Sequence, residues 1–135
     1  MASTKADIVK RYREATGMNW LSSKLLLAGK SPELLERILQ ARTQQPGATT
    51  LHDPIEDHPD YTETIAAIAD EITKELRDEI ARENAKRRAA GKATSLSDWP
   101  LGTSHQLWRR LKKRLADQGI TWHSIAEMNP GCRFD

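Results

Sequence analysis

Hydrophobic residues recur every three to four positions through most of this chain, which is the spacing of amphipathic α-helices. In residues 1–44 this spacing predicts a unit of three helices. The second of them, over 18–28, is hydrophobic on nearly every side, and this pattern is typical of a central, covered helix. The third begins at a strong signal, because Ser31 can cap a helix and Pro32 suits its first turn.

A linker and then a long helix are predicted next. Residues 45–60 contain prolines and a glycine that interrupt any regular pattern, and their acidic side chains predict exposure to water. Residues 60–91 predict one long helix that ends at Gly91. Its hydrophobic positions share an arc roughly 120° wide, and they are Ile65, Ile68, Ala69, Ile72, Leu76 and Ile80. Charged residues occupy the same arc beyond Ile80, so core contact is predicted to stop there while the helix continues.

The C-terminal part of the chain predicts a loop and two more helices. Residues 92–103 are rich in serine, proline and glycine, which indicates a loop. Over 104–128, a basic amphipathic helix is expected to end at Gly119, and Thr121 is expected to cap a short terminal helix. Trp108 shares the apolar arc of the basic helix, so its side chain is predicted to lie in the core.

These elements predict an all-α fold: a small single-domain helical bundle of five or six helices with one long central helix. We expect the three-helix unit to pack on the first half of the long helix and on the basic helix. The composition agrees, because strand formers are scarce: the 135 residues include one Phe, two Tyr and a single Val. The long helix would span about 45 Å, so it is expected to project from the body or to pack against a second copy of the chain.

The charges reverse sign in the middle of the chain. Residues 51–80 hold ten acidic and two basic side chains, whereas residues 82–114 hold ten basic and two acidic ones. The formal net charge of the whole chain is only +2, because the two blocks nearly cancel. Such segregation is typical of a protein that engages a charged partner.

The basic block is a candidate surface for nucleic acid or for another anionic partner. Its candidate contacts are Lys86, Arg87, Arg88, Lys92, Arg109, Arg110, Lys112, Lys113 and Arg114. The first four cations also suit the C-terminal end of a helix, whereas the cluster at 109–114 begins in mid-helix with no acid in reach before Asp117. If about six phosphates were neutralised, the logarithm of the affinity would fall with the logarithm of the salt concentration at a slope near −5.

Two stretches resemble helix-turn-helix DNA-binding motifs. Residues 111–129 resemble the opening of a phage-repressor-type motif, with a basic helix followed by Gly-Ile-Thr and an Ile-Ala pair. Only six residues follow Asn129, which is too few for a recognition helix. Residues 13–27 place a glycine turn between two helices, but the second of these helices is predicted to be covered. Neither stretch identifies a family.

The acidic block is a candidate surface for a protein partner, and its charge suits it to imitate a polyanion. Its candidate contacts are Asp53, Glu56, Asp57, Asp60 and Glu63. Hard divalent cations favour such oxygen-rich loops, but the spacing of a calcium-binding loop is missing. We therefore expect an exposed acidic linker without a metal.

Neither catalysis nor a cofactor is expected. The single cysteine, Cys132, excludes an internal disulfide and a multi-cysteine zinc site. No serine has an identifiable base and acid around it. No segment approaches membrane-spanning length, and the N-terminus has no apolar run of the kind found in signal peptides. The expected location is therefore cytoplasmic, without a membrane partner.

Two functions remain open on this basis. The first is a small non-enzymatic regulatory or inhibitor-type protein that binds a protein partner through charged helical surfaces, with a homodimer through the long helix as one form of association. The alternative is a nucleic-acid-binding accessory or regulatory protein that uses the basic 82–114 region. We favour the first slightly, because the acidic block has no role in binding nucleic acid. The alternative requires the cations at 109–114 to be unmatched by carboxylates of the same chain.

Overall fold

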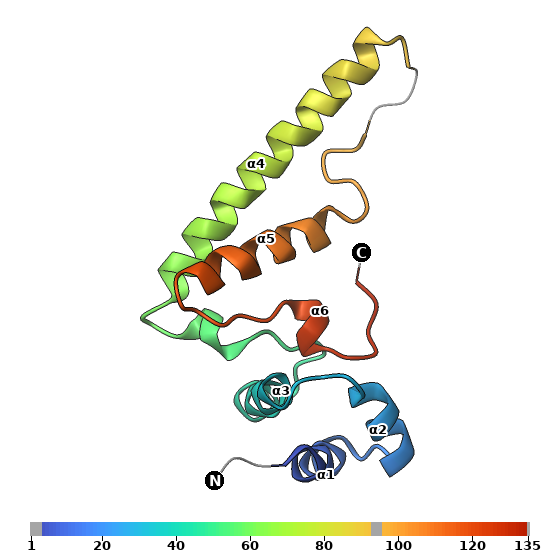
Figure 1. The fold of residues 1–135 in the computed structure, drawn as a ribbon, viewed down its shortest axis with the longest axis vertical. Helices are drawn as coiled ribbons and strands as arrows, with labels where there is room; N and C mark the ends of the chain where they lie inside the picture. The colour runs from blue at the N-terminus through green and yellow to red at the C-terminus, as the bar shows by residue number, and fades with distance from the viewer. Residues whose placement is uncertain (1–3, 93–95, 135) are drawn as a thin grey trace. The chain divides into compact units, whose positions relative to one another are not determined.

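Every regular element of the computed structural model is a helix within residues 4–92 and 96–134, which are the residues that the structure describes (Figure 1). The elements are α1 (Lys5–Thr16), α2 (Trp20–Leu27), α3 (Pro32–Gln44), the 3-10 turn η1 (Pro54–Asp57), α4 (Thr62–Ala89), α5 (Thr103–Asp117) and α6 (Ile125–Met128). The predicted all-α fold with one long helix is confirmed. Part of the predicted loop at 92–103, residues 93–95, lies outside the described residues.

The contacts divide the chain into two compact units. The first, here called the N-terminal unit, consists of residues up to His58 together with 123–134. The second, here called the hairpin unit, consists of residues 59–122.

In the N-terminal unit, α1 and α3 pack together, and α2, η1 and α6 adjoin one or the other of them. Side chains cap α1, α2 and α3 at their N-terminal ends, because Thr4, Asn19 and Ser31 each accept a hydrogen bond from a backbone N–H in the first turn. The core consists mainly of Ile8, Tyr12, Leu27, Leu34, Leu35, Ile38, Leu39, Ala41, Leu51 and Met128. The predicted cap and proline at the start of α3 are therefore confirmed.

The C-terminal tail belongs to this unit because Asn129 bonds to the backbone of Leu51 in both directions. Its Oδ1 accepts from Leu51 N at 2.8 Å, and its Nδ2 donates to Leu51 O at 2.7 Å. Ser124, not Thr121 as predicted, caps α6, and it does so through a capping box with Glu127. Gly131 lies against α2, where an added Cβ would stand 3.0 Å from the side chain of Leu26.

The prediction that the second helix is covered on all sides is wrong. Only Ser23 and Leu27 of α2 are buried, whereas Trp20, Leu21 and Leu25 are 50%, 61% and 70% exposed. The helix has eight residues and reaches the core along one narrow stripe, which Leu26 borders as a half-buried side chain packed against the core.

The hairpin unit consists of α4 and α5, which pack antiparallel (Figure 1). The predicted apolar arc of α4 is buried at Ile65, Ile68, Ile72 and Leu76, and Ile80 is half-buried. Leu111 and Leu115 supply the buried positions of α5. Trp108, which was predicted to lie in the core, is only half-buried.

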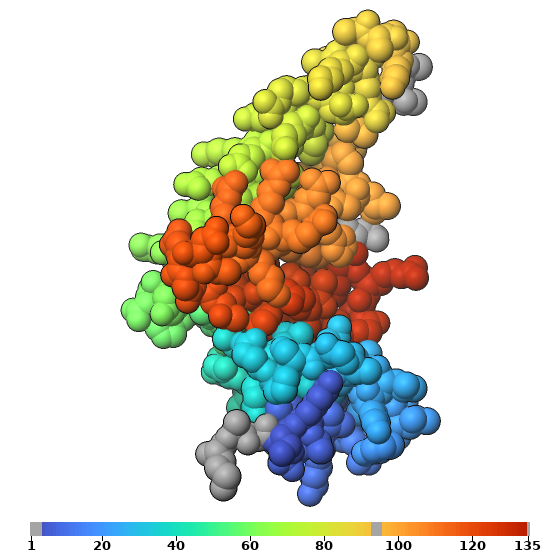
Figure 2. Space-filling view, in the orientation of Figure 1, coloured from blue at the N-terminus to red at the C-terminus, as the bar shows by residue number. Residues whose placement is uncertain are grey.

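Beyond Ile80, α4 continues to Ala89, as predicted, and forms a narrow extension of its unit (Figure 2). Asn84 holds the returning chain against this extension, since its side chain bonds to both the N–H and the carbonyl of Leu96 at 2.6 and 3.1 Å. Trp99 then lies 5.7 Å from the guanidinium of Arg77, and its indole N–H donates to Ser104 Oγ. These contacts fix the start of α5.

Candidate interaction surfaces

A ladder of ion pairs joins the basic helix α5 to the acidic half of α4. The guanidinium of Arg110 donates to both carboxylate oxygens of Glu79 at 2.9 and 3.1 Å, and it lies 3.7 Å from Glu75. Arg114 donates to Glu75 at 2.6 and 2.7 Å and lies 4.0 Å from Glu71. The ladder forms because residues four apart share a helix face and the helices run antiparallel.

The ladder shifts the pKa of Glu79 and of Arg110 in the directions expected for opposite charges. The hydrogen bond from Arg110 lowers the pKa of Glu79, and the same bond raises the pKa of Arg110. The expectation that the cations at 109–114 have no acid in reach is therefore wrong for two of the five. Sequence proximity misled it, because the matching carboxylates lie more than 30 residues earlier.

Arg109 and Lys113 of α5 take no part in this ladder. Arg109 and Lys113 are exposed and take part in no ion pair within the described part of the chain, while Lys112 is half-buried. Arg109, Lys113 and Arg110 line, with Gln106, an open depression of about 510 Å³. Only part of the predicted anionic-partner surface on α5 is thus available to a partner.

At the C-terminal end of α4, the cations are less neutralised. Arg87 pairs with Glu83 across one helical turn at 3.4 Å. Lys86, Arg88 and Lys92 are exposed, and no ion pair of theirs is found among residues 4–92 and 96–134. These three side chains lie where the helix dipole itself favours cations.

The predicted acidic surface is only partly a surface. Asp57 and Asp60 are exposed, Glu56 is half-buried, and Glu63 is exposed in the first turn of α4. Asp57 also pairs with His52 at 2.5 Å. The prediction that the acids of the linker face water is wrong for Asp53, which is completely buried.

Asp53 organises a buried polar network in the N-terminal unit. Its carboxylate accepts two hydrogen bonds from Arg37, at 2.8 and 3.1 Å, and one each from the backbone N–H groups of Ile55 and His123 at 3.0 and 2.9 Å. The Arg37 guanidinium also donates to Glu33 at 3.2 Å. A single carboxylate therefore fastens η1 and the chain before α6 to α3.

The imidazole of His123 extends this network. It is 6% exposed and lies between two carboxylates, with Nε2 2.8 Å from Glu33 and Nδ1 3.5 Å from Glu127. Burial by itself lowers the pKa of His123, but the two glutamates outweigh burial, and the net effect is a raised pKa. In the sequence, only Glu127, four residues later, hints at a role for this histidine, because Glu33 lies 90 residues earlier.

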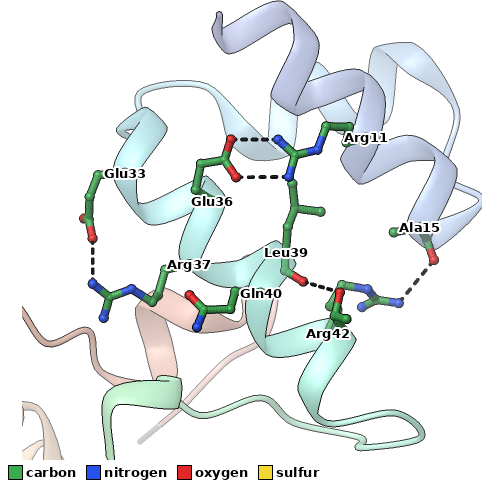
Figure 3. A pocket seen from close by; sticks show the side chains of 9 residues that line it. Arg11, Ala15, Glu33, Glu36, Arg37, Leu39, Gln40 and Arg42 are labelled. Atoms are coloured by element: carbon green, nitrogen blue, oxygen red, sulfur yellow. Dashed lines mark hydrogen bonds and ion pairs between the residues drawn. The ribbon is translucent and has the colours of Figure 1, made fainter. Parts of the chain in front are cut away.

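A wide polar groove lies between α1 and α3, with a volume of about 790 Å³ (Figure 3). Arg11 forms a bidentate pair with Glu36 at 2.7 and 3.0 Å across it. Arg42 reaches only the carbonyl of Ala15, at 3.4 Å. Two of the three arginines that line the groove, Arg11 and Arg37, are already paired with glutamates, which leaves Arg42 to attract an anionic ligand.

A second cavity, of about 430 Å³, lies between α1 and α2. Ala6, Val9, Leu27 and Ala28 supply apolar lining, and Trp20 forms part of its wall. Its remaining lining residues are Lys5, Lys24 and Gly29. This cavity adjoins the exposed apolar side of α2, which the sequence had indicated to be covered.

The two stretches that resemble helix-turn-helix motifs, residues 111–129 and 13–27, both lack a second helix suited to the major groove of DNA. After α5, the first of them holds only the four residues of α6. In the second, α2 exposes apolar side chains and a single cation, Lys24.

In the described ranges, no three His, Cys, Asp or Glu side chains are arranged to hold a metal ion. No helix in those ranges is both long and apolar enough to cross a membrane. Comparisons with protein-family models, with curated proteins and with solved structures found no significant match.

Proposed function

We propose that this chain is a small regulatory or inhibitor-type protein that acts by binding a protein partner. The observation that carries the proposal is the ladder between α4 and α5, in which Arg110 and Arg114 are matched by Glu71, Glu75 and Glu79. Cations that already have carboxylate partners contribute little to the binding of a polyphosphate chain, because no counterions are released on their account.

The charge balance of the hairpin unit supports the same conclusion. Residues 59–122 contain twelve basic and ten acidic side chains, and the ladder interleaves the two signs on adjoining helices. A surface of mixed sign matches the polar rim of a protein interface, where charges set orientation and partner choice. In the N-terminal unit, taken by itself, the exposed apolar side chains of α2 form a hydrophobic surface of the kind that protein interfaces use.

The test is an affinity purification of the tagged chain from its native cells after exhaustive nuclease treatment. The expected result is a protein that co-purifies in a fixed ratio and still binds when both proteins are produced separately and mixed. If nucleic acid is recovered from the untreated sample and no protein survives nuclease treatment, the proposal is wrong.

Nucleic-acid binding stays the alternative, and one observation favours it. Lys86, Arg88 and Lys92 at the end of α4, and Arg109 and Lys113 on α5, are exposed without carboxylate partners in the described ranges. If all five contacted phosphates, the affinity for duplex DNA would fall with salt at a log–log slope of about −4.5. Replacement of Lys86 and Lys113 by Gln should flatten that slope by about 2, whereas replacement of the paired Arg114 should change it little.

Self-association through α4 also stays a proposal, and the structure limits where it would occur. The apolar arc of α4 is already buried as far as Leu76, so a second copy would have to pack on Ile80 and the extension beyond it. Light scattering of the wild type and of an Ile80→Lys variant tests this. A monomer at high protein concentration in both samples would exclude the homodimer.

A further inference from the structure

Most of the large apolar side chains of α2 lie at least half exposed to solvent and not in the core. Trp20, Leu21 and Leu25 lie within six consecutive residues and are each at least half exposed. At 100° per residue they occupy an arc of about 140°, which begins at Trp20, beside the buried Leu27, and continues through Leu21 to Leu25 on the side away from Ser23. Scattered exposed leucines need no explanation, but a contiguous apolar surface that includes a tryptophan marks a binding site more often than not.

The cavity between α1 and α2 gives this surface a concave part. Its volume of about 430 Å³ exceeds that of any single side chain and falls within the range of small binding pockets. Its floor is apolar, since Ala6, Val9, Leu27 and Ala28 contribute no charged group. A hydrophobic side chain inserted there would lose water on several sides, which is the environment of interface hot spots.

The charges around this cavity are all positive. Among the described residues that line it, Lys5 and Lys24 are the charged ones, and the ammonium of Lys24 lies 4.6 Å from the centre of the Trp20 ring. Arg13 follows Val9 by one turn on the same face of α1, and its buried Nε has no hydrogen-bond partner. The cavity therefore combines an apolar floor with two lysines, Lys5 and Lys24, for which no carboxylate partner is found among residues 4–92 and 96–134.

We infer that this α1–α2 cavity, together with Leu21 and Leu25, docks a segment of a protein partner in which a large apolar side chain is flanked by carboxylates. The inference rests on the proposed function, and it names the chemistry of the partner at one site. The apolar side chain fills the cavity beside Trp20. The flanking carboxylates meet Lys5 and Lys24, which makes the sign of the partner's charge the specificity determinant.

An anionic membrane surface would also suit apolar side chains near lysines, but the geometry favours a protein segment. Protruding side chains insert into a lipid surface, which leaves a concave site on the protein unfilled, whereas the anchor side chain of a peptide fills such a site. The docking helix is also only eight residues long, shorter than the amphipathic helices that lie in membrane interfaces.

The test uses three synthetic twelve-residue peptides and the whole 15N-labelled chain. The first peptide carries one central Trp flanked by two Glu on each side, the second has Lys in place of Glu, and the third has Ser in place of Trp. The Trp20 indole N–H resonance, assigned by its loss in Trp20→Phe, reports binding at the cavity. We expect this resonance to shift with the first peptide, with an affinity at least tenfold higher than for the second or third.

Variants make the assignment specific. Lys24→Glu should reverse the preference between the Glu and Lys peptides, whereas Lys86→Glu, the same change in the hairpin unit, should leave it unchanged. Ala6→Phe should fill the cavity and weaken binding at least tenfold while retaining the helical circular dichroism spectrum. Leu101→Ala is the matched apolar control, because Leu101 is 83% exposed in the other unit; this variant should bind as the wild type does.

The inference is overturned if the Trp20 resonance is unmoved at millimolar peptide, or if all three peptides bind alike. Tighter binding to phosphatidylglycerol vesicles than to the Glu peptide, with loss in Ala6→Phe, would assign the site to membranes and also overturn it. A co-purifying protein partner whose affinity is unchanged by Lys24→Glu and Ala6→Phe would refute this site while leaving the proposed function intact. Peptide binding without any protein partner in cells would refute the proposed function instead.

Discussion

Replacement of Asp53 by Ala should destabilise the N-terminal unit more than replacement of any other carboxylate named above. The side chain is completely buried, and it accepts four hydrogen bonds, two of them from Arg37. Removal of one partner from a buried ion pair costs about 3–5 kcal/mol, because the remaining charge loses its compensation. Arg37 keeps its bond to Glu33 and its side chain is 20% exposed, which places the loss for this pair near 3 kcal/mol.

The two backbone donors add to this cost. The N–H groups of Ile55 and His123 would lose their acceptor, and a buried donor left unpaired costs about 1–3 kcal/mol. Water that enters the space left by the carboxylate would satisfy part of this demand. The expected loss for Asp53→Ala is therefore about 3–5 kcal/mol, a large share of the stability of a domain this size. Asp53→Asn keeps an acceptor oxygen and should lose roughly half as much.

The assay is urea unfolding at 25 °C, followed by circular dichroism at 222 nm and by tryptophan fluorescence, so that the two units are observed separately if they unfold separately. Asp57→Ala is the matched control, since Asp57 ends the 3-10 turn that Asp53 caps, but it is exposed and forms an exposed ion pair with His52. Its cost should stay below about 0.5 kcal/mol. A loss below about 1 kcal/mol for Asp53→Ala, or equal losses for the two variants, would refute the reasoning from burial.

Three further predictions use the same unfolding measurement. The pKa of His123 is raised in the folded protein, so protonation of this histidine stabilises the fold. This stability is fully present below about pH 6.5 and is lost as the pH rises through the folded pKa. The stability of the His123→Gln variant, measured over the same pH range, should lack this decline. Leu25→Ala should cost less than about 0.5 kcal/mol because Leu25 is 70% exposed, whereas Leu27→Ala, on the opposite face of the same helix, should cost about 2–5 kcal/mol. Equal costs would mean that both faces of α2 are covered. Arg110→Ala should cost less than about 1 kcal/mol and the cost should shrink in high salt, since its pair with Glu79 is solvent-exposed; a salt-independent loss would contradict this.

Local signals in the sequence were sufficient to place most helices. The Ser31–Pro32 start, the apolar arc from Ile65 to Leu76 and the charged continuation beyond Ile80 all depend on neighbours within one or two turns, and the structure has each of them. The cap of α6 was assigned to Thr121 instead of Ser124 because both can cap. The Glu127 that completes the capping box three residues after Ser124 was the stronger signal.

The prediction that α2 is covered on all sides is wrong because composition alone does not show how many other elements surround a helix. An apolar run such as that around Leu25 fits either a helix buried on every side or a short helix with an interface on its outer side. What decides is how many other elements surround it, and α2 contacts mainly α1. The burial of Asp53 was equally hidden, because its partners Arg37 and His123 lie 16 and 70 residues away in the sequence.

The ladder between the helices shows what the charge reversal in the sequence does within this fold. The glutamates of α4 recur every four residues at 71, 75 and 79, and the arginines of α5 recur with the same spacing at 110 and 114. Both rows flank an apolar arc, so the burial of these arcs in an antiparallel pair brings the rows together. Exposed pairs of this kind contribute little stability each, but they form only when the two rows lie side by side, so they add to the selection that burial of the apolar arcs makes. The segregated blocks therefore serve first to align the hairpin, and only the cations outside the ladder remain for a partner.

On this basis, exchange of the ladder charges, with Arg110 and Arg114 made Glu and the three glutamates made Lys, should preserve the helical fold. Either half of the exchange alone should weaken it. Equal stability of all three variants would show that the apolar arcs set the register without the charges.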